Sequence, residues 1–242
     1  MDLSILQDRT VLVTGASRGI GRATALKLAA EGARLILVGR SLKDLNETAE
    51  LVSSSGTVPI VLTADFSSLE SVFSLVSSIK EEVPIMDGII HNAGQALSAS
   101  IEESSEEDWD RIMTVNAKAP FFLTKELLPL MEKSDFKRIV IVASVVGHQG
   151  YPLQSMYTAS KHALTGWSKS LARELQDRGY RIHVVNPGGV ATEMVTSVRP
   201  DIDVDQLIGP QEIAEWILFL MSRTGNSMVD NVNIRRESKT AW

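Results

Sequence analysis

The chain has 242 residues, of which 44% are hydrophobic and 22% are charged. This is the composition of a globular protein with enough apolar side chains to form a sizeable core. The formal net charge of −6 gives no general attraction to nucleic acid or to anionic lipid, so neither is expected as a partner. The absence of cysteine excludes disulfides, thiolate catalysis and cysteine-ligated metal, and no metal site is predicted.

The sequence shows no targeting or membrane-spanning segment. Its first eight residues lack both a basic start and a long apolar stretch, so no signal peptide is expected. No apolar run approaches the roughly 18 residues that cross a bilayer. We therefore expect a cytoplasmic protein.

Short apolar runs alternate with longer amphipathic stretches along the whole chain. Strands are predicted at Thr10–Thr14, Arg34–Gly39, Val58–Thr63, Asp87–His91, Lys137–Ser144, Arg181–Asn186 and Val229–Ile234. Helices are predicted at Gly19–Glu31, Leu42–Ser54, Ser68–Glu81, Glu106–Met131, Met156–Arg178 and Gln211–Met221. This order is typical of repeated βαβ units, so we expect an α/β protein with a doubly wound parallel sheet of about seven strands, in a single domain over 1–242.

Several residues mark the predicted helix boundaries. They are Ser67 with Glu70 and Ser104 with Glu107 as capping boxes, Gly32 and Gly179 as left-handed helix ends, and Pro210 in a first helical turn. These are the residue types that such positions favour. The stretch 193–209 has no strong periodicity and is predicted to be a mobile flap over the substrate.

A glycine-rich turn follows the first predicted strand directly. It reads Thr14-Gly15-Ala16-Ser17-Arg18-Gly19-Ile20-Gly21, with a helix beginning at its last two glycines. Glycines at this place let backbone N–H groups and the helix N-terminus approach a pyrophosphate closely. A tight turn without a ligand is the alternative.

The motifs after this turn fall in the order of a known family. They are Asp65, Asn92-Ala93-Gly94, Asn116, Ser144, Tyr157-x-x-x-Lys161 and Asn186-Pro187-Gly188. Together with Thr14–Gly21, they make the sequence similar to the short-chain dehydrogenase/reductase family over nearly its whole length. The resemblance implies a Rossmann-type fold and a nicotinamide cofactor.

The resemblance also assigns residues to that cofactor. They are Gly15, Ser17, Arg18, Gly19, Ile20 and Gly21 in the turn, Asp65 at the adenine, Asn92, Ala93 and Gly94 along the cofactor, Pro187, Gly188 and Thr192 near the nicotinamide, and Tyr157 together with Lys161, which would also hold the nicotinamide ribose. Asp65 beside Ser67 can equally be a carboxylate at a helix start, and Pro187 can be a residue that only shapes a turn. His91 replaces the commoner asparagine of the family and is expected to be a hydrogen-bonded histidine at a strand end.

Charge at the second strand indicates which cofactor is used. An NAD site normally presents a carboxylate there to the ribose 2′-hydroxyl, whereas this chain has Gly39 followed by Arg40. Arg40 and Arg18 offer guanidinium groups suited to a 2′-phosphate. NADP(H) is therefore the predicted cofactor, although two solvated surface arginines remain an alternative.

Tyr157 and Lys161 stand at i and i+4 and hence on one helix face. An ammonium about 4 Å from the phenol supplies roughly 4 kcal/mol at an effective dielectric of 20, and this is enough to lower the tyrosine pKa from about 10 toward 7. Ser144, 13 residues before the tyrosine, is predicted to close a strand and to polarise a substrate carbonyl. By resemblance, Asn116 kinks its helix and holds a water in a proton relay; a local bond to backbone is the alternative.

The predicted function is an NADP(H)-dependent oxidoreductase that moves a hydride between NADPH and a carbonyl or alcohol substrate, of carbonyl or 3-oxoacyl reductase type. Asn116, Ser144, Tyr157 and Lys161 would be its catalytic residues, with the tyrosine as proton donor. The alternative is a catalytically idle NADP(H)-binding sensor or scaffold. By resemblance, the helices Glu106–Met131 and Met156–Arg178 would form a homodimer or homotetramer, although the tail 235–242 departs from the family pattern.

Overall fold

Seven parallel strands form one sheet in the order β3-β2-β1-β4-β5-β6-β7. The computed structural model describes residues 3–198 and 202–239. The strands are β1 Thr10–Thr14, β2 Arg34–Gly39, β3 Ile60–Thr63, β4 Gly88–His91, β5 Arg138–Val142, β6 Arg181–Pro187 and β7 Asn231–Ile234. The helices are α1 Gly19–Ala30, α2 Leu42–Ser53, α3 Leu69–Glu82, α4 Glu106–Met113, α5 Ala119–Met131, α6 Ser155–Leu175, α7 Glu193–Val198 and α8 Pro210–Ser222. The predicted doubly wound sheet is confirmed.

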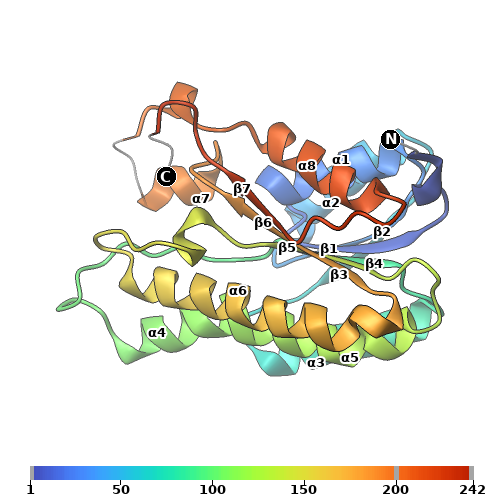
Figure 1. Cartoon of the computed structure of the whole chain (residues 1–242), viewed down its shortest axis with the longest axis horizontal. Helices are drawn as coiled ribbons and strands as arrows, with labels where there is room; N and C mark the ends of the chain where they lie inside the picture. Colours follow the sequence, from blue (N-terminus) through green and yellow to red (C-terminus); the bar gives the residue numbers. More distant parts are fainter. Residues whose placement is uncertain (1–2, 199–201, 240–242) are drawn as a thin grey trace.

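Helices cover both faces of the sheet. Figure 1 shows α1, α2 and α8 on one side and α3, α4, α5 and α6 on the other. The central strand β1 contributes to both cores, because Leu12 packs with the α3, α5 and α6 side while Val11 and Val13 pack with α1 and α8. Burial on both faces explains why the central strands are mostly apolar, whereas the edge strand β7 alternates asparagine with apolar residues and stays partly exposed.

Two predicted capping boxes are wrong by one residue. The hydroxyl of Ser68, not Ser67, caps α3 by accepting from the backbone N–H of Ser71. Ser105, not Ser104, caps α4 in the same way. Each neighbouring serine offers the same chemistry, so only the backbone path decides which one caps.

The other helix-boundary predictions are confirmed. Gly32 and Gly179 have φ angles of 80° and 81°, which is the left-handed region that glycine adopts without steric cost. Pro210 is the first residue of α8. The backbone N–H of Gly209 donates to Oε1 of Glu212 at 2.7 Å, which closes the start of that helix.

The predicted continuous helix Glu106–Met131 is interrupted. A π-helical segment, Thr114–Lys118, separates α4 from α5 and has Asn116 at its centre. Single π-turns inside α-helices occur frequently at functional sites. Here the widened turn carries the asparagine that the family resemblance singles out.

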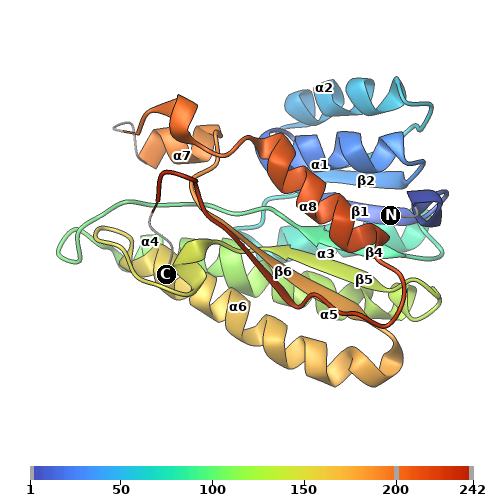
Figure 2. The same ribbon diagram turned by 45° about the horizontal axis from the view of Figure 1, so that its top comes forward.

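The predicted flap 193–209 is partly regular. It contains α7 and a 3₁₀ turn, Val204–Gln206, and Figure 2 shows α7 projecting beyond the ends of the strands. Residues 199–201 of the flap and 240–242 of the tail lie outside the described residues. Within the described ranges, no helix combines the length and the apolar character needed to cross a bilayer.

Candidate active site

A cavity of about 870 Å³ opens at the carboxyl ends of the strands. Such a volume lies within the range of small-molecule and cofactor sites. The predicted site residues that line it are Gly15, Ser17, Arg18, Gly19, Ile20, Arg40, Asp65, Asn92, Ala93, Gly94, Ser144, Tyr157, Lys161, Pro187, Gly188 and Thr192. Of the predicted set, only Gly21 and Asn116 are not on this lining.

Three positions of the glycine turn disfavour any residue with a side chain. Gly15 and Gly19 have φ angles of 65° and 56°, a conformation that disfavours other residues. A Cβ on Gly21 would lie 2.1 Å from the carbonyl oxygen of Gly15. Gly21 therefore supports the turn from behind, and the start of α1 remains open toward the cavity.

Thr14 and Asn92 join this turn to β4. The side-chain amide of Asn92 donates to the carbonyl oxygens of Thr14 and Gly15 at 3.0 and 3.1 Å. The hydroxyl of Thr14 accepts from the backbone N–H groups of Asn92 and Ala93, both at 3.0 Å. The sequence reasoning missed this role of Thr14, although its place in the turn motif was a signal.

Gly39 stands where the turn packs against β2. A Cβ at Gly39 would lie 2.4 Å from Oγ of Ser17, so a larger residue there would require the Ser17 side chain to move. Arg40, the next residue, is exposed and lines the cavity. Position 39 thus lacks the carboxylate that would repel a phosphate, and a cation stands beside it.

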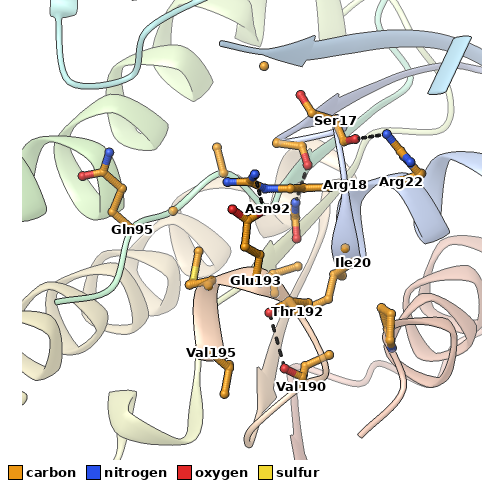
Figure 3. A pocket seen from close by; sticks show the side chains of 18 of the residues that line it. Ser17, Arg18, Ile20, Arg22, Asn92, Gln95, Val190, Thr192, Glu193 and Val195 are labelled. Carbon is orange, nitrogen blue, oxygen red and sulfur yellow. Dashed lines mark hydrogen bonds and ion pairs between the residues drawn. The ribbon is translucent and has the colours of Figure 1, made fainter. Parts of the chain in front are cut away.

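Arg40 and Arg18, the two arginines predicted to hold a 2′-phosphate, each lie near a carboxylate. The backbone N–H and the hydroxyl of Ser67 donate to Oδ1 of Asp65 at 2.9 and 2.8 Å, and these bonds, with the charge of Arg40, hold the pKa of Asp65 below its usual value. Asp65 is thus held by Ser67 in the turn that precedes α3, whose N-cap is Ser68, and its contact with adenine stays a prediction. Arg18 forms an ion pair with Glu193 of the flap, as Figure 3 shows.

Arg22 fixes the other side of the glycine turn. Its guanidinium donates to the carbonyl oxygen of Ser17 at 2.5 Å and to Oγ1 of Thr48 at 2.9 Å, and Figure 3 shows the first of these bonds. Thr48 in turn donates to the carbonyl oxygen of Ala16 at 3.1 Å. These contacts tie the turn to α2, and no motif in the sequence predicts them.

Ser144 lies two residues beyond the end of β5, not at its last position as predicted. It precedes the 3₁₀ turn Val145–Gly147, and its Oγ accepts from the backbone N–H of Val146 at 3.3 Å. Its hydroxyl also stands 3.5 Å from the carbonyl oxygen of Pro187 and is hydrogen-bonded to the side chain of Tyr157. These bonds place the two hydroxyls together at the cavity.

Lys161 lies below the phenol of Tyr157 on the same face of α6. Its Nζ is 5.7 Å from the ring centroid and donates to the carbonyl oxygen of Val142 at 3.3 Å. The side chain is buried, with 4% of its surface exposed. No ion pair to a carboxylate is found for it within residues 3–198 and 202–239.

The predicted lowering of the tyrosine pKa toward 7 is wrong for the free protein. Burial raises the pKa of Tyr157 to about 12, against a smaller lowering by the Ser144 hydrogen bond. Burial also lowers the pKa of Lys161 to about 8. The reason is desolvation, which disfavours the charged form of both groups.

Asn116 fastens the π-helical segment to the loop after β4. Its Oδ1 accepts from the backbone N–H of Gln95, and its Nδ2 donates to the carbonyl oxygen of Gln95, both at 2.8 Å. Nδ2 also donates to Oγ of Ser160 at 2.9 Å. The partners lie far along the chain, so the alternative of a local backbone bond does not describe this side chain.

Gly94 brings this asparagine and the lysine together. A Cβ at Gly94 would lie 3.2 Å from Oδ1 of Asn116 and 3.6 Å from Nζ of Lys161. The loop after β4 therefore passes close to both side chains, and a Cβ at this position would crowd Asn116. Gln95, which the sequence reasoning did not single out, supplies the backbone groups that hold Asn116.

His91 ends β4 but lies outside the cavity lining. Its Nε2 is 2.7 Å from Oγ1 of Thr124, whose own proton goes to the carbonyl oxygen of Pro120 at 2.8 Å. The imidazole must therefore donate through Nε2. Its ring also meets Trp167 edge to face, as expected for a hydrogen-bonded core histidine.

A sequence model of the family described as short chain dehydrogenase matches residues 9–203. The chain belongs to the short chain dehydrogenase family. The match covers the glycine turn, the Ser144–Tyr157–Lys161 group and the first part of the flap.

Members of this family with similar sequences span most of the chain. An uncharacterized oxidoreductase of Escherichia coli K12, YciK, is 38% identical over 90% of this chain and 87% of its own. The 3-oxoacyl-[acyl-carrier-protein] reductase FabG of the same organism is 35% identical over 89% of this chain and 91% of its own. A short chain dehydrogenase from Shigella flexneri, solved in complex with NADP, superposes with a TM-score of 0.89 at 35% identity, covering 96% of this chain and 99% of that one.

Proposed function

We propose that the protein is an NADP(H)-dependent reductase of carbonyl compounds, with Tyr157 as the proton donor. The observation that carries this proposal is that one cavity is lined both by the glycine turn and by Ser144, Tyr157 and Lys161. A protein that only held the nucleotide would have no need of a hydrogen-bonded serine–tyrosine pair above a buried lysine.

The residues at the cavity fit a phosphorylated dinucleotide. The turn at Gly15–Gly21 leaves the start of α1 open, which suits a pyrophosphate. Gly39 stands where NAD sites typically have an acid, and Arg40 and Arg18 are the cations that would hold a 2′-phosphate. The NADP complex of the Shigella flexneri relative supports this choice.

Reduction of a carbonyl needs one hydride at carbon and one proton at oxygen. NADPH supplies the hydride when it is bound. Ser144 donates a hydrogen bond from Oγ to the carbonyl oxygen, where negative charge develops. Tyr157 then transfers the proton of its hydroxyl to that oxygen, and the alcohol forms.

The pKa of about 12 for Tyr157 bears on the direction of this reaction. A phenol with this pKa keeps its proton throughout the neutral range and is ready to donate it. The reverse reaction, oxidation of an alcohol, needs the phenolate, which burial disfavours in the free protein. In the free protein the phenol is therefore in the protonated form, which is the form that donates a proton in the reduction.

The proposal also covers the class of substrate and the oligomeric state. The similarity to a 3-oxoacyl reductase and the apolar flap residues Met194 and Val195 on the cavity lining favour 3-oxoacyl thioesters among the candidate carbonyl compounds. By family resemblance we expect a cytoplasmic homodimer or homotetramer built on α4, α5 and α6. Light scattering gives the number of subunits directly.

The test is the oxidation of NADPH in the presence of a panel of ketones, aldehydes, diketones and 3-oxoacyl thioesters. Turnover of at least one carbonyl class is expected, and Tyr157→Phe should abolish it while the Kd for NADPH changes by less than about twofold, since the phenol proton is needed only for the chemical step. A fully active Tyr157→Phe variant would refute the assignment of the proton donor.

Tyr180→Phe is the matched control. Tyr180 lies just before β6, at the amino ends of the strands and so away from the cavity at their carboxyl ends, and its hydroxyl donates to Oε1 of Glu132 at 2.7 Å. Its loss should leave turnover unchanged. If the wild-type protein binds NADPH but reduces no member of the panel, the sensor or scaffold function is the correct one.

A further inference from the structure

The two ends of the flap 193–209 lie side by side. Val190 and Ile208 form an isolated parallel bridge, in which the backbone N–H of Ala191 donates to the carbonyl oxygen of Ile208 at 2.8 Å and that of Ile208 donates to Gly189 at 3.0 Å. The two ends of the flap are therefore joined to each other by backbone hydrogen bonds.

The chain at the start of the flap touches the glycine turn at two neighbouring places. A Cβ built on Gly19 would lie 3.0 Å from Cγ2 of Thr192. The next residue, Glu193, is the first of α7, and its carboxylate pairs with the guanidinium of Arg18. In Figure 3 the two side chains meet over the cavity.

Both partners of this ion pair are accessible to a ligand. The side chains of Arg18 and Glu193 are 58% and 65% exposed, and both residues line the cavity. Arg18 makes no hydrogen bond from its side chain to any other described residue. Among the residues that the structure describes, Glu193 is therefore the group that a ligand must displace in order to bind the guanidinium of Arg18.

A carboxylate and a phosphate need the same edge of a guanidinium. Arginine binds either group through paired N–H donors in one plane, so one guanidinium edge serves one of them at a time. A 2′-phosphate carries up to two negative charges against one on the glutamate. The phosphate is thus the stronger partner, but it must displace Glu193 first.

We propose that Glu193 competes with the 2′-phosphate of NADP(H) for Arg18 and so sets the affinity for the cofactor. This inference rests on the proposed function, because it takes NADP(H) as the ligand. It adds that a flap residue, remote in sequence from the glycine turn, is a determinant of cofactor binding. A cofactor without the 2′-phosphate has no group that replaces Glu193 at Arg18.

The test compares Glu193→Gln with the wild-type protein in equilibrium binding. Adenosine 2′,5′-bisphosphate and 5′-AMP are the probes, with NADPH and NADH measured in parallel. Because exposed ion pairs contribute roughly 0.2–1 kcal/mol, Glu193→Gln should tighten binding of NADPH and of the bisphosphate by about 1.5- to 5-fold. Binding of NADH and of 5′-AMP should not change.

Asp205→Asn is the matched control, since Asp205 is another exposed flap carboxylate and is not paired with Arg18. It removes the same charge and should leave all four dissociation constants unchanged. In the Arg18→Gln background, NADPH should bind more weakly than to the wild type, and adding Glu193→Gln should have no further effect.

Three results would overturn the proposal. They are unchanged NADPH binding in Glu193→Gln, equal tightening of NADPH and NADH, and an effect of Glu193→Gln that persists without Arg18. Equal tightening would mean that the flap obstructs the pyrophosphate or the whole cofactor. Failure of the wild-type protein to bind NADPH at all would instead refute the proposed function, so the two failures are distinguishable.

Discussion

Replacing Lys161 by methionine should stabilise the protein at neutral pH. The ammonium is buried, its described polar contact is the carbonyl oxygen of Val142, and its pKa falls from 10.5 to about 8. One pKa unit corresponds to about 1.4 kcal/mol, so keeping this group charged in the folded state costs about 3 kcal/mol. Methionine has a similar length and no charge. Allowing about 1 kcal/mol for the lost hydrogen bond, we expect a net gain of about 2 kcal/mol.

The gain should depend on pH in a defined way. Between pH 8 and 10.5 the unfolded chain keeps the Lys161 proton while the folded protein releases it, so wild-type stability rises with pH across this window. Below pH 8 both states are protonated and the full penalty applies; above 10.5 both are neutral and it vanishes. The advantage of Lys161→Met should therefore be largest at pH 7 and disappear near pH 10.5.

Thermal and urea unfolding at pH 7, 9 and 10.5 measure this dependence. About 2 kcal/mol corresponds to a rise in Tm of roughly 4–8 °C for a chain of this size. Lys169→Met, an exposed position on the same helix, controls for loss of a lysine from α6. A Lys161→Met variant that is less stable than wild type at pH 7, or a difference that stays constant from pH 7 to 10.5, would refute the reasoning.

Two further outcomes follow from the same structure. Burial lowers the pKa of His91 to about 3, so its imidazole should show no titration by NMR between pH 5 and 8. The stability of the folded protein should fall as the pH drops from 6.5 toward 3, because the unfolded chain takes up the proton first. Arg40→Ala should lower kcat/KM for NADPH by about 10- to 100-fold, the magnitude of a charge-assisted contact, and should leave kcat/KM for NADH unchanged; an equal loss with both cofactors would contradict its assignment to the 2′-phosphate.

The layered fold could be predicted because each strand carries its own signal. The β1 residues Val11, Leu12 and Val13 are apolar in succession, which is typical of a strand covered on both sides. Helix ends were readable where geometry demands one residue type, as at Gly32 and Gly179. They were misplaced where adjacent serines offer the same hydrogen bond, because the choice depends on a backbone path that propensity does not encode.

The residues of the candidate site were readable as motifs, but their energetics were not. The sequence places Tyr157 one turn from Lys161 and so predicts their proximity. It does not reveal how deeply the pair is buried, and burial reversed the expected direction of the pKa shift of Tyr157. The Arg18–Glu193 pair was missed for a related reason, since the two residues are 175 positions apart in the sequence and meet only through the folding of the flap.

The buried lysine connects stability to the proposed chemistry. A cation without a carboxylate partner among the described residues raises the free energy of the folded protein, and that penalty is relieved when negative charge arrives beside it. In the proposed reaction such charge develops on the carbonyl oxygen next to Tyr157, within reach of the same electrostatic field. Stability and activity should therefore move in opposite directions at Lys161, since the methionine that relieves the penalty in the free protein also removes the charge that favours the transition state.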